Sequence, residues 1–230
     1  MGIQERKERE KEHRREEIVD AAQKVFFDKG LQAATMDEIA ETAELSKGTL
    51  YIYYKSKEDV YLAVVMRGLQ ILHDMFESRI RSEGQVVKAM IGLQETYYEF
   101  FKTHRNHFRM LHYLQTPQFH RQVSDEMKQS CAVVNKKMWD LVIALIQRGI
   151  DESILVSHLN AAELGIFLWS GATQLMIRID TESERWQMGM KIDLERVLRV
   201  SNLLMLESIM TPDARRDNEP LLHEILPRNS

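Results

Sequence analysis

The sequence predicts an all-α protein, and three observations support this fold class. The 230 residues contain four prolines, and three of them lie after residue 211, so long segments are free of proline: Pro117, Pro212, Pro220 and Pro227. Apolar residues recur at helical spacing along these segments. The Asn-Gly and Asp-Gly pairs that mark β-hairpins are absent from the sequence. We therefore expect helices throughout, in one large or two modest domains.

Composition and charge exclude several classes of protein. The apolar share of 44% and the charged share of 29% are ordinary for a globular protein. No apolar run is long enough to span a membrane. The charged N-terminus, residues 1–17, lacks the apolar core of a secretory signal. A single cysteine, Cys131, forms no internal disulfide and suits a reducing compartment. We expect a cytoplasmic protein without a membrane partner.

Apolar spacing places the expected helices in order along the chain. In the first helix, Ile18, Ala22 and Val25 share one face, and Gly30 is a suitable C-terminal stop. The other long helices are expected near 64–76, 86–101, 123–149, 160–179 and 192–210, with a short one at 106–114. The tail after Thr211 is expected to be loose apart from one short turn at 221–226.

The N-terminal block of charges indicates a solvated extension of the first helix. Residues 5–17 contain six basic residues and six glutamates. Opposite charges four residues apart, such as Glu10 and Arg14, stabilise an exposed helix. We expect three parts along the chain: an N-terminal domain that includes this extension (1–62), a larger helical domain (63–211) and a proline-containing tail (212–230).

Three helix starts follow one another in a short segment of the N-terminal domain. Thr35 and Glu38 form a Thr-x-x-Glu capping box. Ser46 stands where an N-cap would begin the next helix. Ser56 and Asp59 make a third start of the same kind. Helices this closely spaced must be short and joined by a minimal turn.

The spacing of these caps predicts a helix-turn-helix. A two-turn helix at 36–43 and a tight turn at 44–45 fit between the first two caps. Ala40 and Ala43 are small enough to let a second helix cross closely. The residues expected to form the shared core are Ile39, Leu45, Leu50 and Tyr54. Two short helices at such a crossing are typical of this motif.

The second of these helices, 47–54, carries groups suited to the major groove of DNA. Lys47 and Gly48 lie in its first turn, where backbone N–H groups favour phosphate oxygens. Tyr51 shares the exposed face with Lys47, and the Tyr53 hydroxyl can reach the sugar-phosphate backbone. Lys57 adds a cation at the next helix. The net charge of −4 gives no support for DNA binding. The same pattern of residues also fits a structural helical bundle with packed tyrosines.

This segment closely resembles the DNA-binding domain of the TetR/AcrR family of one-component repressors. The matching stretches are 22–30, 35–40, 46–51 and 54–58, within the first quarter of the chain. The resemblance implies DNA contacts at Thr35, Ser46, Lys47, Gly48, Thr49, Tyr51, Tyr53 and Lys57. Many members read Tyr-Tyr-His-Phe where this chain reads Tyr-Ile-Tyr-Tyr, from Tyr51. Ile52 therefore loses a polar contact, which predicts a different operator preference.

The same resemblance implies a larger helical-bundle domain, from about residue 65, that binds an effector and dimerises. Methionine and aromatic side chains suit an adaptable apolar pocket, although they also fit an ordinary core. The candidate effector-binding residues are Tyr97, Phe101, Phe108, Tyr113, Met127, Met138, Trp139 and Trp169. An apolar small molecule is expected: a fatty acid, acyl thioester, hydrophobic drug or aromatic compound. A basic cluster either anchors an anionic head group or forms a solvated face: His104, Arg105, His107, Arg109 and His112.

The last two long helices carry stripes of small and large apolar residues that suit a homodimer. The candidate dimerisation residues are Leu168, Ala172, Leu175, Val197, Leu198, Leu204 and Met205. Four such helices, two from each chain, would form a symmetric bundle. A dimer sets two recognition helices roughly 34–36 Å apart on a palindromic operator. An internal layer of the same chain is the alternative explanation for these stripes.

No enzyme chemistry, cofactor or metal is expected. The sequence has no recognisable nucleophile–base pair or Gly-rich phosphate loop, and His104 and His107 lack further ligands at fixed spacing. We expect a ligand-responsive transcriptional repressor that binds operator double-stranded DNA and is released by its effector. The alternative is a DNA-binding protein of the same fold without a small-molecule effector, controlled by a protein partner or acting on chromosome organisation.

Overall fold

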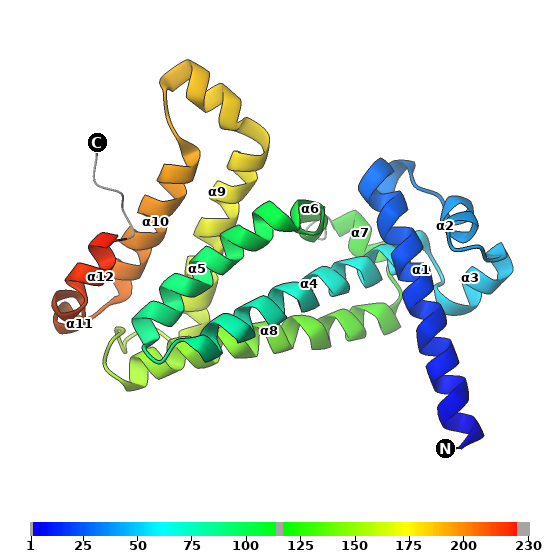
Figure 1. Ribbon diagram of the computed structural model, residues 1–230, viewed down its shortest axis with the longest axis horizontal. Helices are drawn as coiled ribbons and strands as arrows, with labels where there is room; N and C mark the ends of the chain where they lie inside the picture. The colour runs from blue at the N-terminus through cyan, green and yellow to red at the C-terminus, as the bar shows by residue number, and fades with distance from the viewer. Residues whose placement is uncertain (1, 114–116, 225–230) are drawn as a thin grey trace. The chain divides into compact units, whose positions relative to one another are not determined.

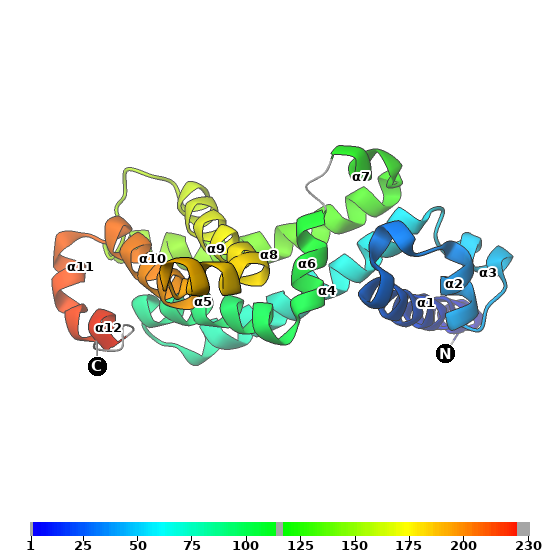
Figure 2. The ribbon, with the colours of Figure 1, turned by 90° about the horizontal axis from the view of Figure 1, so that it is seen from above.

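The computed structural model describes residues 2–113 and 117–224, without the side chains of residues 3, 113 and 224. Helices dominate this part of the chain (Figures 1 and 2), so the predicted all-α class is confirmed. No helix within these residues combines the length and the hydropathy needed to cross a membrane.

The chain divides into two compact units. Unit 1 contains residues 1–72 and 104–137, and unit 2 contains residues 73–103 and 138–230. The helices of unit 1 are α1 (Ile3–Ala33), α2 (Met36–Thr42), α3 (Lys47–Tyr53), α6 (Arg105–Tyr113) and α7 (Pro117–Gln122). Those of unit 2 are α5 (Val86–Thr103), α9 (Ala161–Met190), α10 (Leu194–Ile209), α11 (Pro212–Asp217) and α12 (Glu219–Glu224). Two helices contribute residues to both units: α4 (Lys57–Ser82) and α8 (Asp125–Asp151).

The core of unit 1 forms around the apolar face of α1. Ile18 and Ala22 are fully buried there, as their spacing predicts. The Phe26 ring lies edge-on to Tyr61 of α4, with 5.1 Å between ring centroids. Tyr61 in turn lies against Phe119 of α7 at 5.5 Å. These aromatic contacts join the first and fourth helices to the α7 segment, so α1, α4 and α7 share one core.

Gly30 breaks α1 near its C-terminal end. Its φ of +71° lies in the left-handed region that favours glycine, and the chain then turns through Leu31–Ala33 before α2. The amide N–H of Ala34 donates to the Gly30 carbonyl at 3.2 Å. The first helix is therefore interrupted at Gly30, as predicted, but the interruption is a kink that one further turn follows.

Several helix boundaries differ from the sequence-based expectations. The expectation of a loose tail is wrong for residues 212–224. Thr211 caps α11, and Ala214 is buried in the core of unit 2. The helix α7 was not predicted, and Pro117 begins it at a position where no N–H is needed. α9 continues eleven residues beyond the expected end at 179, to Met190. This last part is mostly exposed, so apolar periodicity does not reveal it.

In unit 2, α9 and α10 pack closely against each other. Gly171 of α9 makes this possible, because a Cβ atom there would lie 2.7 Å from Met205 Sδ of α10. The end of α10 is fixed by two backbone bonds: Val156 N–H donates to the Ile209 carbonyl at 2.8 Å, and Thr211 N–H donates to the Ile154 carbonyl at 2.9 Å. Part of the small-and-large stripe is thus used within the chain.

In unit 1, α6 reaches α4 and α1 through one buried histidine. His107 is 4% exposed, and a Cβ atom on Gly68 of α4 would lie 2.9 Å from its Nδ1. The Phe27 ring of α1 is edge-on to the imidazole at 5.0 Å. Burial lowers the pKa of His107 to about 4, with smaller contributions from His104 and Arg67. His107 is therefore neutral near pH 7 and acts as an apolar ring packed into the Gly68 notch.

Gly68→Val is expected to lower the free energy of unfolding by about 1–3 kcal/mol, because the added carbons overlap the buried imidazole. The measurement is chemical denaturation followed by circular dichroism. Gly189→Val is the matched control, since Gly189 is also helical but has no atom within 4 Å of its Cβ position. Equal losses for the two variants would contradict the close packing of α6 on α4.

Candidate nucleic-acid interface and ligand cavity

The turn between α2 and α3 is fixed by local hydrogen bonds. The Thr35 hydroxyl accepts from Glu38 N–H at 3.2 Å, and the Glu38 carboxylate accepts from Thr35 N–H at 3.0 Å. Glu44 takes a left-handed φ of +55°, and Leu45 N–H donates back to the Ala40 carbonyl at 2.9 Å. The predicted capping box and tight turn are both confirmed.

Helix α3 has one buried anchor and an exposed face. Leu50 is fully buried, together with Ile39 of α2 and, at the helix end, Tyr54, as predicted for the shared core. Ser46 caps the helix, because its hydroxyl accepts from Thr49 N–H at 3.1 Å. Lys47, in the first turn, is exposed. The first turn of α3 therefore presents side chains and backbone outward.

The predicted DNA-contacting residues all lie in unit 1, but they differ in exposure. Five are exposed: Thr35, Ser46, Lys47, Gly48 and Tyr51. Three are half-buried: Thr49, Tyr53 and Lys57. Ile52, which departs from the family pattern, is 79% exposed. An apolar side chain this exposed at the end of α3 has no role in the core of unit 1.

Two of the lysines are held by partners. Lys47 Nζ lies 2.6 Å from Asp37 Oδ1 of α2, and this hydrogen bond and charge raise the pKa of Lys47. Lys57 Nζ donates to the carbonyl of Ala34 at 2.8 Å and to that of Gln32 at 3.4 Å. Lys57 thus binds the carbonyls that follow the kink of α1. Its predicted role at DNA remains a prediction.

Unit 2 contains a small apolar cavity of about 70 Å³ between four helices. Its wall is formed by Phe76 of α4, by α5 from Met90 to Tyr97, by α8 from Met138 to Ile146 and by α9 from Gly165 to Ala172. Trp139 and Trp169 meet there edge-to-face, 5.8 Å between centroids. No charged side chain lines it among the described residues. The cavity therefore suits an uncharged, apolar group.

The polar groups at the cavity wall are few. Tyr97 and Thr173 share a hydrogen bond of 2.9 Å between their hydroxyl oxygens. Burial raises the pKa of Tyr97 to about 12, so the phenol stays neutral. The Gln94 amide donates to the Asn202 carbonyl at 3.4 Å. These groups offer hydrogen bonds to a ligand but no counter-charge.

Comparison with known proteins places the N-terminal part of the chain in a family. The family model described as "Bacterial regulatory proteins, tetR family" matches residues 18–64, which hold the capped helices described above. Residues 18–64 therefore form a tetR-family domain.

Curated relatives of the chain are named as transcriptional regulators. It is 30% identical over 141 residues to the transcriptional activator FasR of Mycolicibacterium smegmatis, covering 60% of this chain and 61% of FasR. It is 31% identical over 80 residues to the repressor KstR2 of the same organism, covering 35% and 39%. The chain thus spans less than two thirds of either relative. None of these names is that of an enzyme, which agrees with the sequence-based expectation.

Solved structures extend the likeness of the fold to most of the chain. The regulator FadR from Bacillus subtilis, solved in complex with stearoyl-CoA, matches with a TM-score of 0.64 and 17% identity. The match covers 84% of this chain and 98% of FadR. At this identity the likeness concerns the fold alone, which the two chains share beyond the helix-turn-helix.

The structure brings together only half of the predicted effector-binding residues. Tyr97, Met138, Trp139 and Trp169 line the cavity of unit 2. Phe101 is buried in the same unit but away from the lining, whereas Phe108 and Met127 belong to unit 1. The side chain of Tyr113 lies outside the described residues. The histidine-rich cluster at 104–112 also belongs to unit 1 and contributes nothing to the lining.

Some lining residues were assigned by sequence to a different role. Leu168 and Ala172, predicted to dimerise, form part of the cavity wall with Gly165. The signal for them was present, because these positions on α9 recur at helical spacing with Trp169. Phe76 of α4 was missed as a lining residue, since its spacing indicates only a core position.

The predicted dimerisation residues differ in exposure. Leu198 and Ala172 are buried, and four more are half-buried: Leu168, Leu175, Val197 and Met205. Leu204 of α10 is 57% exposed. On α9 the exposed large apolar side chains are Ile166, Phe167, Met188 and Met190, which the sequence-based stripe did not include. The apolar surface of α9 therefore lies beside the predicted stripe.

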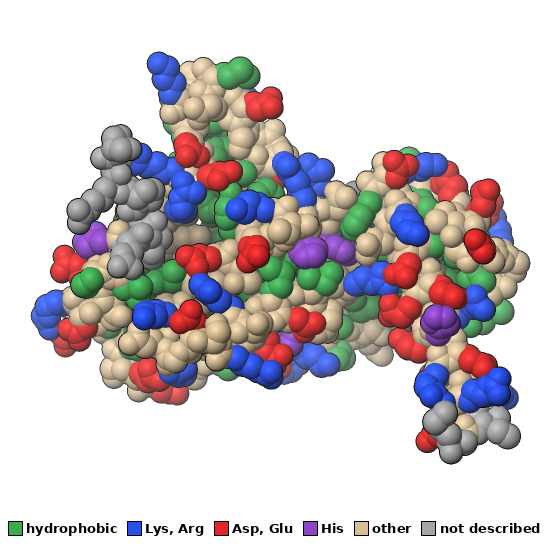
Figure 3. Space-filling model, viewed as in Figure 1, with side chains coloured by type: hydrophobic (Ala, Val, Ile, Leu, Met, Phe, Trp, Pro, Cys, Tyr) green, Lys and Arg blue, Asp and Glu red, His purple; other side chains and the backbone are tan. Residues whose placement is uncertain are grey.

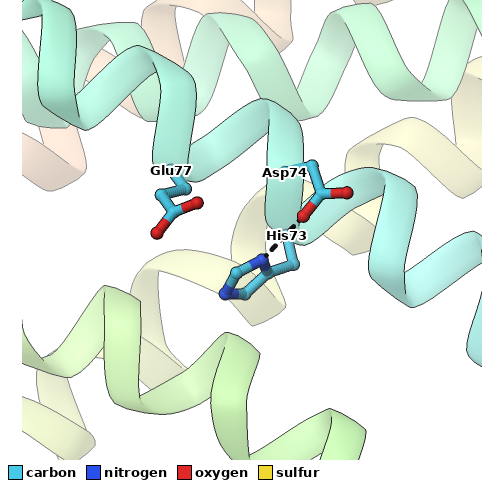
Figure 4. A group of neighbouring side chains, drawn as sticks. All are labelled: His73, Asp74 and Glu77. Atoms are coloured by element: carbon cyan, nitrogen blue, oxygen red, sulfur yellow. Dashed lines mark hydrogen bonds and ion pairs between the residues drawn. The ribbon is translucent and has the colours of Figure 1, made fainter. Parts of the chain in front are cut away.

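One group of side chains on α4 has metal-binding atoms close together (Figure 4). The ligand atoms of His73, Asp74 and Glu77 lie within 4.8 Å of one another. His73 Nδ1 is 3.1 Å from Asp74 Oδ1, and Glu77 pairs with Arg81 at 2.7 Å. These contacts between neighbouring side chains of one helix account for the arrangement, and we assign no metal to it.

Lys57→Gln is expected to lower the free energy of unfolding by about 1–2 kcal/mol, because the carbonyls of Ala34 and Gln32 lose a charged donor. Thermal or chemical denaturation measures this loss. Lys55→Gln removes the same charge two residues away, from an exposed side chain, and should change stability by less than about 0.5 kcal/mol. A Lys57 variant as stable as the Lys55 variant would contradict a stabilising contact between Lys57 and these two carbonyls.

Proposed function

We propose that this tetR-family chain is a ligand-responsive transcriptional repressor that binds a palindromic operator as a dimer. The observation that carries the DNA-binding part is α3, whose capped first turn is held outward by buried Leu50. Its N–H groups and Lys47 face solvent, where phosphate oxygens can approach. Tyr51, one turn later, is placed to reach base edges or sugars. FasR is named as an activator and KstR2 as a repressor, so the relatives include proteins that activate and proteins that repress transcription.

Dimerisation is proposed through the outer sides of α9 and α10. Ile166 and Phe167 of α9 and Leu204 of α10 are exposed apolar side chains that a partner would cover. Charged side chains on a monomer surface need no such cover, whereas grouped apolar ones favour association. A symmetric pair would hold two α3 helices one DNA turn apart. Cytoplasmic localisation is proposed with this role, because operator DNA lies there in bacteria.

An apolar effector is proposed to enter the cavity of unit 2. At about 70 Å³ the cavity is much smaller than the roughly 300–1,000 Å³ of ligand sites, so binding must push its walls apart. Without a lining charge, it suits an acyl chain or a fused-ring hydrocarbon better than a carboxylate. FadR was solved with stearoyl-CoA, and one neighbour is titled a ketosteroid regulator, which supports testing both classes.

The residues that line the cavity suggest how binding of the effector would change the affinity for DNA. Phe76 lines it and belongs to α4, whose first turn follows α3 directly in the chain. A ligand that displaces Phe76 therefore shifts a continuous helix that begins at the recognition segment. The effector then favours a shape of the dimer that binds DNA less well, and DNA disfavours the effector reciprocally.

The DNA-binding part is tested on an operator obtained by in vitro selection from random duplexes. Lys47→Gln combined with Tyr51→Ala should weaken operator binding roughly tenfold or more and lower the log–log salt slope by about 1. Fluorescence anisotropy at several salt concentrations measures both. Lys88→Gln, an exposed cation on α5 of unit 2, is the control and should leave both values unchanged. Unchanged binding by the double variant would rule out α3 as the reading helix.

The effector part is tested by Ala172→Leu, which fills the cavity from α9. Ligand binding should change the emission of Trp139 and Trp169 in the wild-type cavity, measured with Trp186→Phe as background because Trp186 lies outside the lining. Long-chain acyl thioesters and steroids are the first probes. The filled variant should bind operator normally but lose both the emission change and ligand-induced release.

Ala162→Leu is the matched control on the same helix, since Ala162 is half-buried and away from the lining. It should respond to ligand as the wild type does. Equal loss in both variants would point to a general disturbance of α9. No response of the wild type across these probes would favour a regulator of the same fold without an apolar effector.

A further inference from the structure

The N-terminal extension of α1 has its charges sorted onto different faces. Lys7, Lys11, Arg14 and Arg15 follow a spacing of four, three and one residues, which places them on one side of a helix. Glutamates at positions 8, 12 and 16 follow one another at four-residue spacing on an adjoining side. The extension is neutral in total, but it carries one purely basic stripe: Lys7, Lys11, Arg14 and Arg15.

This basic stripe continues the face by which α1 packs into unit 1. Ile18, Ala22 and Val25 extend the same helical spacing and are buried there. Figure 1 shows the N-terminal part of α1 running on beyond α2 and α3, and Figure 3 shows its charged side chains exposed. The basic stripe is therefore turned toward the side of α1 on which the other helices of unit 1 lie.

A groove connects the basic stripe to the end of the recognition helix. It has a volume of about 710 Å³, and α1 lines it with two cations, Lys11 and Arg15, and with two glutamates, Glu12 and Glu16. Tyr51, Tyr53 and Lys55, from α3 and the following turn, line it as well. A backbone that runs past the end of α3 would thus meet the cations of α1 within one continuous surface.

Two cations of the basic stripe are available to a partner. Lys7 and Lys11 are exposed and make no ion pair with any residue that the structure describes. The arginines around them are engaged: Arg6 with Glu10 at 2.9 Å, Arg14 with Glu17 at 2.6 Å and Arg15 with Glu12 at 3.6 Å. Lys7 and Lys11 therefore keep their hydrogen-bond donors free for a partner.

We propose that the basic stripe of α1 binds the sugar-phosphate backbone of the DNA that flanks each operator half-site. The proposal rests on the proposed function, because α3 must first hold the duplex beside the groove. A neutral extension has little attraction at long range, but screening is weak at contact distance and each neutralised phosphate releases counterions. The contact adds affinity without reading sequence.

The test compares two pairs of charge removals within the extension. Lys7→Gln with Lys11→Gln removes the unpaired cations, and Arg6→Gln with Arg9→Gln removes two exposed cations from the other side of the helix. Anisotropy titrations between 50 and 200 mM salt use the selected operator, either trimmed to its half-sites or extended by one helical turn at each end. Circular dichroism and sedimentation are recorded for each protein.

On the extended duplex, the lysine variant should bind roughly tenfold more weakly than the wild type, with a salt slope lower by about 2. On the trimmed duplex the two proteins should bind alike, and the arginine variant should match the wild type on both. Equal losses for both variants, or wild-type binding by the lysine variant, would overturn the inference. So would a changed sedimentation mass of the lysine variant, which would assign the basic stripe to a second copy of the chain. A wild type that selects no duplex would instead refute the proposed function itself.

Discussion

The exposed face of α3 depends on the burial of Leu50. A helix of seven residues is far too short to be stable alone in water, so its geometry must be imposed from outside. Leu50 supplies this constraint by inserting between α2 and the rest of unit 1, while the Ser46 cap fixes the first turn. With the inner side anchored, Lys47 and Tyr51 are held at the surface. The same burial that stabilises unit 1 thus presents the surface proposed to read DNA.

Around this anchor, unit 1 is stiffened by contacts that bring distant parts of the chain together. The kink at Gly30 exposes carbonyls that Lys57 Nζ binds, which joins the end of α1 to the start of α4. His107 packs its neutral ring into the notch at Gly68 and so ties α6 to the same helix. Asp59, buried in the first turn of α4, accepts from Ser124 N–H at 2.8 Å ahead of α8. The N-terminal half of α4 is therefore bound to three other segments of unit 1.

The core of unit 2 differs from that of unit 1 because it encloses the proposed ligand cavity. Its core contains a cavity of about 70 Å³, whose described lining is mostly apolar, includes the Trp139–Trp169 pair and carries no charge. Enlarging it would separate side chains that now touch, and the cost must come from the apolar surface that a ligand buries. For the proposed regulator, the narrow cavity and one widened by a ligand would be distinct states. The two states would differ in the position of Phe76 and hence of α4.

The sequence by itself determined the elements whose causes are local. The caps at Thr35 and Ser46 bond to residues three positions away, and the core residues of the helix-turn-helix follow from helical spacing. The tertiary structure decided the rest, because the relevant contacts join residues far apart in the chain. Helical spacing indicates that Ala172 and Phe108 face apolar surroundings. Only the fold determines that Ala172 lies in the cavity wall and that Phe108 belongs to unit 1. Likewise, Lys57 was recognisable as a cation, whereas the Ala34 carbonyl that holds it lies 23 residues earlier. A periodic pattern fixes which face of a helix is apolar, and only the fold determines what that face meets.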